Sequence, residues 1–185
     1  MNRICVYCGS RTSSQPIFGE SADQLGHEIA KRTWGVVFGG GKIGMMGRVA
    51  EAALAQNGEV IGIIPTALKV KEVEHTGLSE LIETPDMHTR KAKMEELSHA
   101  FVILPGGFGT LDEFFEILTW RQLGFHNKPI IVVDIDGYFS GLEQYIQRAV
   151  DEDYVRESNV RLFEWVSTVE EAMTFLDGYF QKNTE

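Results

Sequence analysis

The sequence lacks a basic excess and long apolar runs, and each absence excludes a class of protein. Among its 185 residues, 27 Asp and Glu outnumber 17 Lys and Arg, which gives a net charge of −10. General binding to nucleic acid or to an acidic membrane needs a basic surface, so this charge argues against both. No apolar run approaches membrane-spanning length, and no N-terminal segment has the pattern of a signal peptide, so we expect a cytoplasmic protein.

The sequence is also poor in metal ligands and in reactive thiols. Its two cysteines, Cys5 and Cys8, form a C-x-x-C. Zinc would need two more ligands, and the sequence has no second cysteine pair and no close histidine pair. A redox pair normally lies at a helix start, whereas Cys5 lies inside an apparent strand. We therefore interpret both cysteines as structural and expect no metal.

Short β-type runs alternate with helical patterns along the whole chain. The length, with 43% hydrophobic and 24% charged residues, suits one globular domain spanning residues 1–185. Apolar periodicity and glycine or proline stops locate the elements. The expected strands are Arg3–Cys8, Gly35–Phe38, Val60–Ile64, Leu81–Glu83, Ala100–Leu104, Pro129–Val133 and Phe163–Val166. Helices are expected at about 14–32, 44–57, 86–98, 110–123, 141–151 and 169–180.

This alternation predicts an α/β protein with a Rossmann-like, doubly wound parallel sheet and helices on both faces. Ligands of such sheets bind at the carboxyl ends of the strands, near the switch in strand order. The turns that follow Cys8, Phe38 and Leu104 are therefore the candidates for a binding site.

The turn after Phe38 contains a G-x-G-x-x-G pattern formed by Gly39, Gly41 and Gly44. A dinucleotide site would also need an acid at the end of the next strand, which ends instead in Ile63-Ile64-Pro65. A Walker A motif fails as well, because Ile43 stands where Ser or Thr would bind magnesium. We interpret the turn as part of a mononucleotide pocket, with a tight packing turn as the alternative.

The turn after Leu104, Pro105–Glu113, leads from a strand into a helix. Glycines let the backbone approach a ligand, and the first N–H groups of a helix favour an anion such as phosphate. Two acids, Asp112 and Glu113, stand near the helix start. Thr110 and Glu113 also fit the S/T-x-x-E capping box, in which Glu113 would only close the helix start. Local pattern does not decide between these two interpretations.

Positive charge is concentrated at another helix start, in the segment Met87–Met94. Cations there oppose the helix dipole, and a phosphorylated ligand held by Arg90 would explain them. The alternative is that Asp86, Glu95 and Glu96 pair with these cations on a solvated face.

Three segments together carry a resemblance to a known family. Pro105–Glu113 matches PGGxGTxxE, and Met87–Lys91 and Val6–Ser10 stand upstream of it in the family's order. With these elements the chain resembles the Lonely Guy family over almost its whole length. Members are cytokinin riboside 5′-monophosphate phosphoribohydrolases, often mislabelled lysine decarboxylases.

The resemblance implies hydrolysis of a nucleoside 5′-monophosphate to a free adenine-type base and ribose 5-phosphate, without a metal or organic cofactor. It implies a catalytic pair, Arg90 and Glu113, and a homodimer. The substrate contacts that it implies are Glu72, Arg90, Lys91, Gly107, Phe108, Gly109, Thr110, Leu111, Asp112, Glu113 and Thr119.

Two other functions stay open. The protein could be a nucleotide carrier or sensor without hydrolysis, or a phosphoribohydrolase acting mainly on AMP or another purine monophosphate. Arg90 and Glu113 favour an enzyme, because a carrier needs the glycines but not the acid. A lysine decarboxylase would need a Schiff-base lysine and a partner for the pyridine nitrogen of pyridoxal phosphate. The sequence singles out no such lysine.

Overall fold

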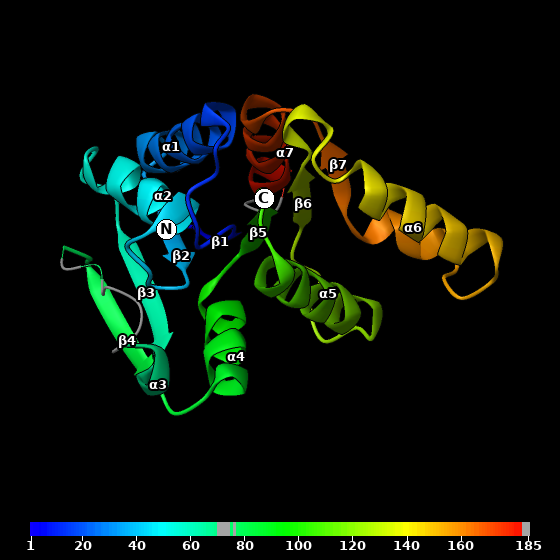
Figure 1. Ribbon diagram of the computed structural model, residues 1–185, viewed down its shortest axis with the longest axis horizontal. Coiled ribbons are helices and arrows are strands. Elements are labelled where there is room, and N and C mark those ends of the chain that lie inside the picture. The colour runs from blue at the N-terminus through cyan, green and yellow to red at the C-terminus, as the bar shows by residue number, and fades with distance from the viewer. Residues whose placement is uncertain (70–74, 76, 183–185) are drawn as a thin grey trace.

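The computed structural model describes residues 1–69, 75 and 77–182, and its centre is one seven-stranded sheet (Figure 1). The strand order is β4-β3-β2-β1-β5-β6-β7, and every neighbouring pair is parallel. This topology confirms the predicted doubly wound Rossmann-like sheet. The strands are β1 (Arg3–Tyr7), β2 (Gly35–Phe38), β3 (Val60–Pro65), β4 (Glu80–Thr84), β5 (Ala100–Ile103), β6 (Ile130–Val133) and β7 (Glu164–Val166).

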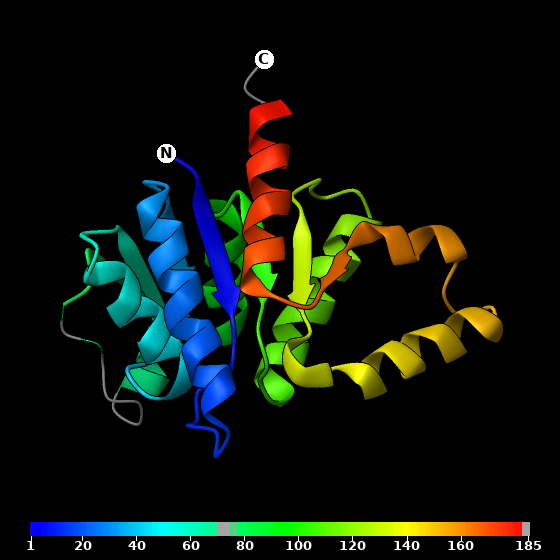
Figure 2. The same ribbon diagram turned by 90° about the horizontal axis from the view of Figure 1, so that it is seen from above.

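Helices cover both faces of the sheet, as Figure 2 shows for the layers in front of and behind the strands. Buried side chains of α1, α2 and α7 form one core with the sheet, and those of α4, α5 and α6 form the other. The helices are α1 (Pro16–Lys31), α2 (Gly44–Leu54), α4 (Met87–Leu97), α5 (Phe108–Gln122), α6 (Ser140–Asp151) and α7 (Val169–Lys182).

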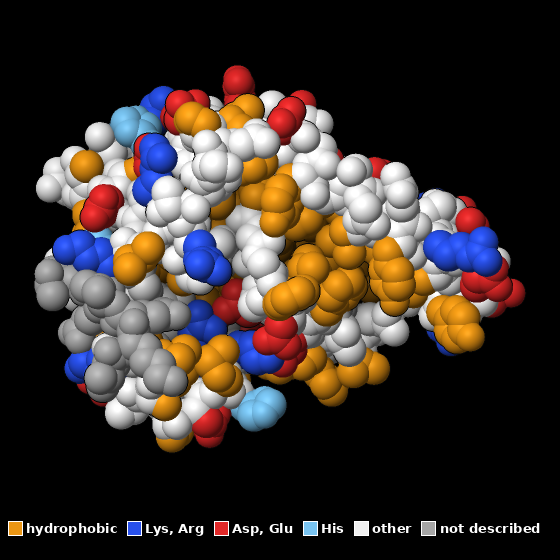
Figure 3. Space-filling model, viewed as in Figure 1, with side chains coloured by type: hydrophobic (Ala, Val, Ile, Leu, Met, Phe, Trp, Pro, Cys, Tyr) orange, Lys and Arg blue, Asp and Glu red, His pale blue; other side chains and the backbone are white. Residues whose placement is uncertain are grey.

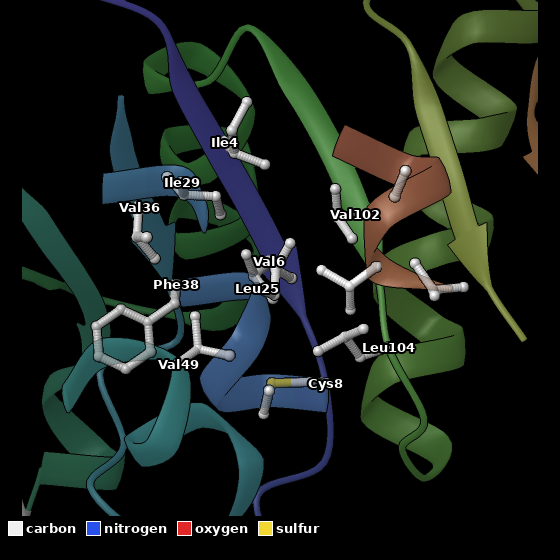
Figure 4. Close-up of a cluster of buried hydrophobic side chains, with 14 of the residues drawn as sticks. Ile4, Val6, Cys8, Leu25, Ile29, Val36, Phe38, Val49, Val102 and Leu104 are labelled. Atoms are coloured by element: carbon white, nitrogen blue, oxygen red, sulfur yellow. The ribbon is translucent and has the colours of Figure 1, made fainter. Parts of the chain in front are cut away.

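The central strand β1 supplies side chains to both cores by simple alternation. Ile4, Val6 and Cys8 face the first core (Figure 4), whereas Cys5 and Tyr7 face the second. Because both faces of the strand are buried from Ile4 onward, the run that begins at Ile4 is continuously apolar. Both cysteines are free, and burial raises the pKa of the Cys5 thiol to about 12, which keeps it protonated and unreactive.

Three short elements were not predicted: α3 (Thr66–Lys69) and the 3₁₀ turns η1 (Ile135–Gly137) and η2 (Glu157–Leu162). Each is too short to show a hydrophobic period. The predicted strands and longer helices are all present, with ends displaced by about one helical turn at most. Within the described ranges, no helix is both long and apolar enough to cross a membrane.

The switch in strand order lies between β1 and β5. These strands are neighbours, yet α1 leaves one for the first face of the sheet and α5 leaves the other for the second. The turns beyond them are bonded to each other, because the Gly9 N–H donates to the Pro105 carbonyl at 3.0 Å. The fold therefore opens a crevice where doubly wound sheets bind their ligands.

Candidate active site

A cavity of about 620 Å³ opens at this crevice. Its volume lies within the range of about 300–1,000 Å³ that is typical of small-molecule sites. All three turns that the sequence singled out contribute to its wall. The lining includes Cys8, Gly9, Ser10, Arg11, Thr12, Ser13, Phe18, Gly39, Met45, Met46, Leu68, Met87, Arg90, Pro105, Gly106, Gly107, Phe108, Gly109, Thr110, Asp112, Glu113 and Tyr138.

The start of α5 forms an open anion-binding surface in this wall. Gly107 is the N-cap residue and no side chain caps the helix. The backbone N–H groups of Phe108, Gly109 and Thr110 donate to no acceptor in the described part of the chain. A Cβ on Gly107 or Gly109 would meet no atom within 4 Å, so the turn faces open space. Unpaired N–H groups and the helix dipole favour a phosphate there.

Glu113 does not close this helix start. Thr110 is the third residue of α5 rather than its N-cap, so the capping-box alternative is not what the structure shows. The Glu113 carboxylate lies one turn further along and accepts a hydrogen bond from Arg90 Nη1 at 2.7 Å. Its side chain is only 10% exposed and that of Arg90 only 8% exposed, which makes this a buried ion pair.

Arg90 reaches Glu113 across the ends of two strands. Its Nε donates to the carbonyl of Ile63 in β3 at 3.0 Å. Its Nη2 passes directly over Gly39 at the end of β2, where an added Cβ would lie 2.2 Å from that nitrogen. Any larger residue at position 39 would therefore displace the guanidinium. Gly39 therefore leaves room for the Arg90 guanidinium in the cavity wall.

The rest of the Gly39–Gly44 turn packs against the turn after β1. Gly44 has φ of 72°, and an added Cβ would lie 2.5 Å from the carbonyl carbon of Ser10. The N–H of Met45, in the first turn of α2, donates to the Gly9 carbonyl at 3.0 Å. The start of α2 is thus occupied by the protein itself. Gly39 is therefore part of the pocket, as we interpreted the turn from the sequence. Gly44 fits the alternative, a tight packing turn.

The charged segment at the start of α4 divides into a cap, a buried side and an exposed side. Asp86 caps the helix, because its Oδ1 accepts from the Thr89 N–H at 2.7 Å. Arg90 and Lys91 are buried, whereas Lys93 pairs with Glu96 at 2.9 Å on the exposed side. The alternative of ion pairs on a solvated face therefore holds for Lys93 but not for Arg90 and Lys91.

Lys91 forms a second connection between α4 and α5. Its Nζ lies 3.0 Å from Asp112 Oδ2 and 2.6 Å from Glu116 Oε2. Burial opposes the charge on Lys91, but the two carboxylates outweigh it and raise the lysine pKa. For Glu113 the balance goes the other way: burial raises the pKa of the carboxyl group, and Arg90 only partly opposes this effect.

The structure gathers most of the predicted site residues at the cavity, but not all of them. Arg90, Gly107–Thr110, Asp112 and Glu113 line it. Among the described residues, Lys91, Leu111 and Thr119 lie outside the lining: Lys91 faces the α5 acids, Leu111 packs on the core, and Thr119 is exposed two turns beyond Glu113. Glu72 lies outside the described residues.

Several cavity residues were missed from the sequence. Met45 and Met46 are apolar residues at the start of α2, for which core packing is the ordinary expectation and contact with an adenine ring the alternative; both are buried and both line the cavity. Phe18 lies on the apolar face of α1, which predicts core packing but not a place in the cavity wall, and Tyr138 belongs to no periodic segment. The only local sign at Tyr138 is that it follows Asp136-Gly137, a turn-type dipeptide after a strand.

These features define a Rossmann-like α/β protein whose cavity joins an anion-binding helix start to a buried carboxylate. The sequence matches the family profile described as "Possible lysine decarboxylase" over residues 46–176, and the chain belongs to this family. It is 40% identical to a cytokinin riboside 5′-monophosphate phosphoribohydrolase of Arabidopsis thaliana, over 96% of this chain and 82% of that one.

A second relative supports the family, and a solved structure supports the fold. A probable cytokinin riboside 5′-monophosphate phosphoribohydrolase of Oryza sativa subsp. japonica is 44% identical over 87% of this chain and 71% of its own. Among solved structures, a molybdenum cofactor binding protein from Rippkaea orientalis superposes with a TM-score of 0.75, covering 97% of each chain. At 20% identity, that likeness shows the fold alone.

The ion pair predicts a large stability effect. Arg90→Met leaves Glu113 buried without its partner, and we expect the free energy of unfolding to fall by about 3–5 kcal/mol. Adding Glu113→Gln removes the unpaired charge, so the double variant should lose less than the sum of the two single variants. Urea unfolding of all four proteins measures this coupling.

The matched control is Arg148→Met, which breaks an ion pair with Glu152 whose arginine side chain is 74% exposed. An exposed pair contributes about 1 kcal/mol or less. Equal losses in Arg90→Met and Arg148→Met would contradict the importance given to burial.

Proposed function

We propose that this protein hydrolyses the N-glycosidic bond of N6-substituted adenosine 5′-monophosphates and releases a free cytokinin or adenine base and ribose 5-phosphate. One observation carries the proposal: the buried Glu113 carboxylate, paired with Arg90, lines the same cavity as the unpaired N–H groups at the start of α5. The names of the plant relatives support the substrate class.

The N–H groups that start α5 and the Glu113 carboxylate belong to one rigid helix, about one turn apart. Glu113 follows Thr110 by three residues, which is a rise of about 4.5 Å along a helix. A 5′-phosphate bound at the Phe108–Thr110 N–H groups would therefore bring the anomeric carbon near the Glu113 carboxylate, so that binding orients the reacting bond.

The residues suit the chemistry of this bond. Cleavage develops positive charge on the sugar, as in other glycosidic bonds, and a carboxylate can stabilise that charge or activate water. We assign that role to Glu113. Arg90 favours the ionised form of Glu113 against the effect of burial. It acts electrostatically on the substrate, because a guanidinium with its very high pKa is a poor proton donor.

The proposed contacts follow the cavity. Arg90, Gly107–Thr110, Asp112 and Glu113 would touch the substrate directly. Contacts from Glu72, Lys91, Leu111 and Thr119 stay predictions from the family motif. The proposed reaction needs no cofactor.

The alternatives differ in what they require of the site. A nucleotide carrier would use the open helix start, and a molybdenum cofactor binding protein shares the fold, but binding alone gives no role to a buried carboxylate. A lysine decarboxylase of the usual kind needs a lysine at the reaction centre. Among the described residues, the cavity wall contains no lysine.

The proposal predicts a defined product pattern. The purified protein should release free base and ribose 5-phosphate from AMP or N6-prenylated AMP, and much less from adenosine or ATP, because only a monophosphate fits the helix start with its sugar beside Glu113. Chromatography of the products measures this. Release from neither monophosphate would refute the enzyme, and equal release from adenosine would refute the role of the phosphate.

Glu113→Gln is the internal control for this assay. Glutamine keeps the size of the side chain but cannot supply a carboxylate, so we expect a folded protein with activity lowered by at least about 10²-fold. Thermal unfolding establishes that the variant is folded. If full activity survives, Glu113 is only a structural residue.

Glu113 also sets the expected pH dependence. Burial raises the pKa of this carboxyl group above its usual value of 4.5. Because only the ionised form can stabilise the cationic sugar, kcat should fall as pH decreases, with a midpoint above 4.5. The nearby Asp112 contributes to the raised pKa, so Asp112→Asn should move the midpoint to lower pH. A midpoint at the ordinary glutamate value in the unchanged protein would contradict this assignment.

We further propose that the protein is a homodimer, as the family resemblance implies. Figure 3 shows apolar side chains gathered over α5 and α6. Leu123 and Phe125, just beyond α5, are 59% and 73% exposed, and Tyr145 on α6 is 64% exposed. Gathered exposed apolar side chains of this size are typical of an interface.

Sedimentation equilibrium tests this proposal. We expect twice the 20.8 kDa chain mass for the unchanged protein and a shift to monomer for Leu123→Glu/Phe125→Glu, because charge in an apolar interface is costly. The comparison variant is Lys31→Glu, on the opposite face at the end of α1. A monomeric unchanged protein at micromolar concentration would refute the dimer.

A further inference from the structure

Tyr138 connects the second half of the sheet to the anion-binding turn. It follows β6, and its ring forms part of the cavity wall. Its hydroxyl donates to the Gly106 carbonyl at 2.7 Å, although the two residues are 32 positions apart. Neither the motif nor the apolar periodicity pointed to this contact.

The loop before Tyr138 holds the side chain in the position from which its hydroxyl reaches the Gly106 carbonyl. Asp136 and Gly137 both have left-handed backbones, with φ of 53° and 67°. The loop is closed by Asp134, whose Oδ1 accepts from the Phe139 N–H at 2.6 Å. The Tyr138 ring also packs edge-on against Phe18, with 5.4 Å between ring centroids. The side chain is therefore fixed by backbone, hydrogen bond and ring packing together.

The Gly106 carbonyl belongs to the peptide that leads into the N-cap residue. A trans peptide is planar, and its C=O and N–H point in opposite directions, so a hydrogen bond to the Gly106 oxygen also fixes the Gly107 N–H. This peptide lies between two glycines and has no side chain of its own to hold it. Position 106 accepts no larger residue, because a Cβ there would lie 2.0 Å from Thr110 Oγ1.

We infer that Tyr138 is a positioning residue for phosphate recognition: its hydroxyl holds the Gly106–Gly107 peptide in the orientation that the phosphate-binding turn requires. The inference rests on the proposed function, because it takes the ligand of the turn to be the 5′-phosphate. Tyr138 acts through the turn and needs no contact with the reacting bond.

The test is Tyr138→Phe, which removes the hydroxyl and keeps the ring against Phe18. Calorimetry with ribose 5-phosphate and adenosine, and with AMP in the Glu113→Gln background, separates the loss of phosphate recognition from a loss of general packing in the cavity wall. We expect affinity for AMP and ribose 5-phosphate to fall about three- to tenfold, the effect of one lost hydrogen bond, and affinity for adenosine to stay unchanged. In turnover, KM for AMP should rise by a similar factor while kcat stays within about twofold.

Tyr154→Phe is the matched control, since Tyr154 is 88% exposed beyond α6. Unchanged affinity for ribose 5-phosphate in Tyr138→Phe would overturn the inference. An equal loss of affinity for adenosine would overturn it too, because Tyr138 would then act only by packing in the cavity wall. If the unchanged protein binds AMP without hydrolysing it, the proposed function fails while the binding comparison still decides the role of Tyr138. If it binds no phosphate ligand at all, both proposals are refuted.

Discussion

The buried ion pair between Arg90 and Glu113 is the contact on which the site depends. It joins α4 to α5 across the carboxyl ends of the strands, with 2.7 Å between nitrogen and oxygen. Neither charge would be tolerated there alone, because an isolated buried charge is costly. The surroundings are shaped to this pair: Gly39 leaves room for the guanidinium, and the Ile63 carbonyl accepts its Nε. The carboxylate is thereby kept in a cavity wall where an acid would otherwise not be stable.

In the proposed site, the first turn of α5 recognises the phosphate and the second turn supplies the reacting carboxylate. The opening N–H groups are free for an anion, and Glu113 follows one turn later on the same rigid helix. A helix fixes that separation far better than a loop could, so a bound phosphate determines where the sugar meets the carboxylate. Lys91 and Tyr138 support the two ends of this arrangement, one through the α5 acids and the other through the Gly106 carbonyl.

The fold itself does not decide between an enzyme and a carrier. A molybdenum cofactor binding protein shares it at 20% identity over nearly the whole chain, so function has to be argued from the site. The open helix start serves either role. The feature that separates them is the buried Glu113 carboxylate, because holding a phosphate requires no acid. The dimer, the cytoplasmic location and the individual substrate contacts stay predictions.

The sequence by itself determined the sheet, the order of its elements and the turn at Pro105–Glu113. Strand burial, helical period and glycine turns are local patterns, and each is written in neighbouring residues. Local pattern left three matters open: whether Glu113 caps its helix, whether Arg90 lies on a solvated face, and what the Gly39–Gly44 turn contacts. Only the tertiary structure decided them. The partners of these residues lie tens of positions away in the sequence. They meet only because the parallel sheet places the carboxyl ends of its strands side by side.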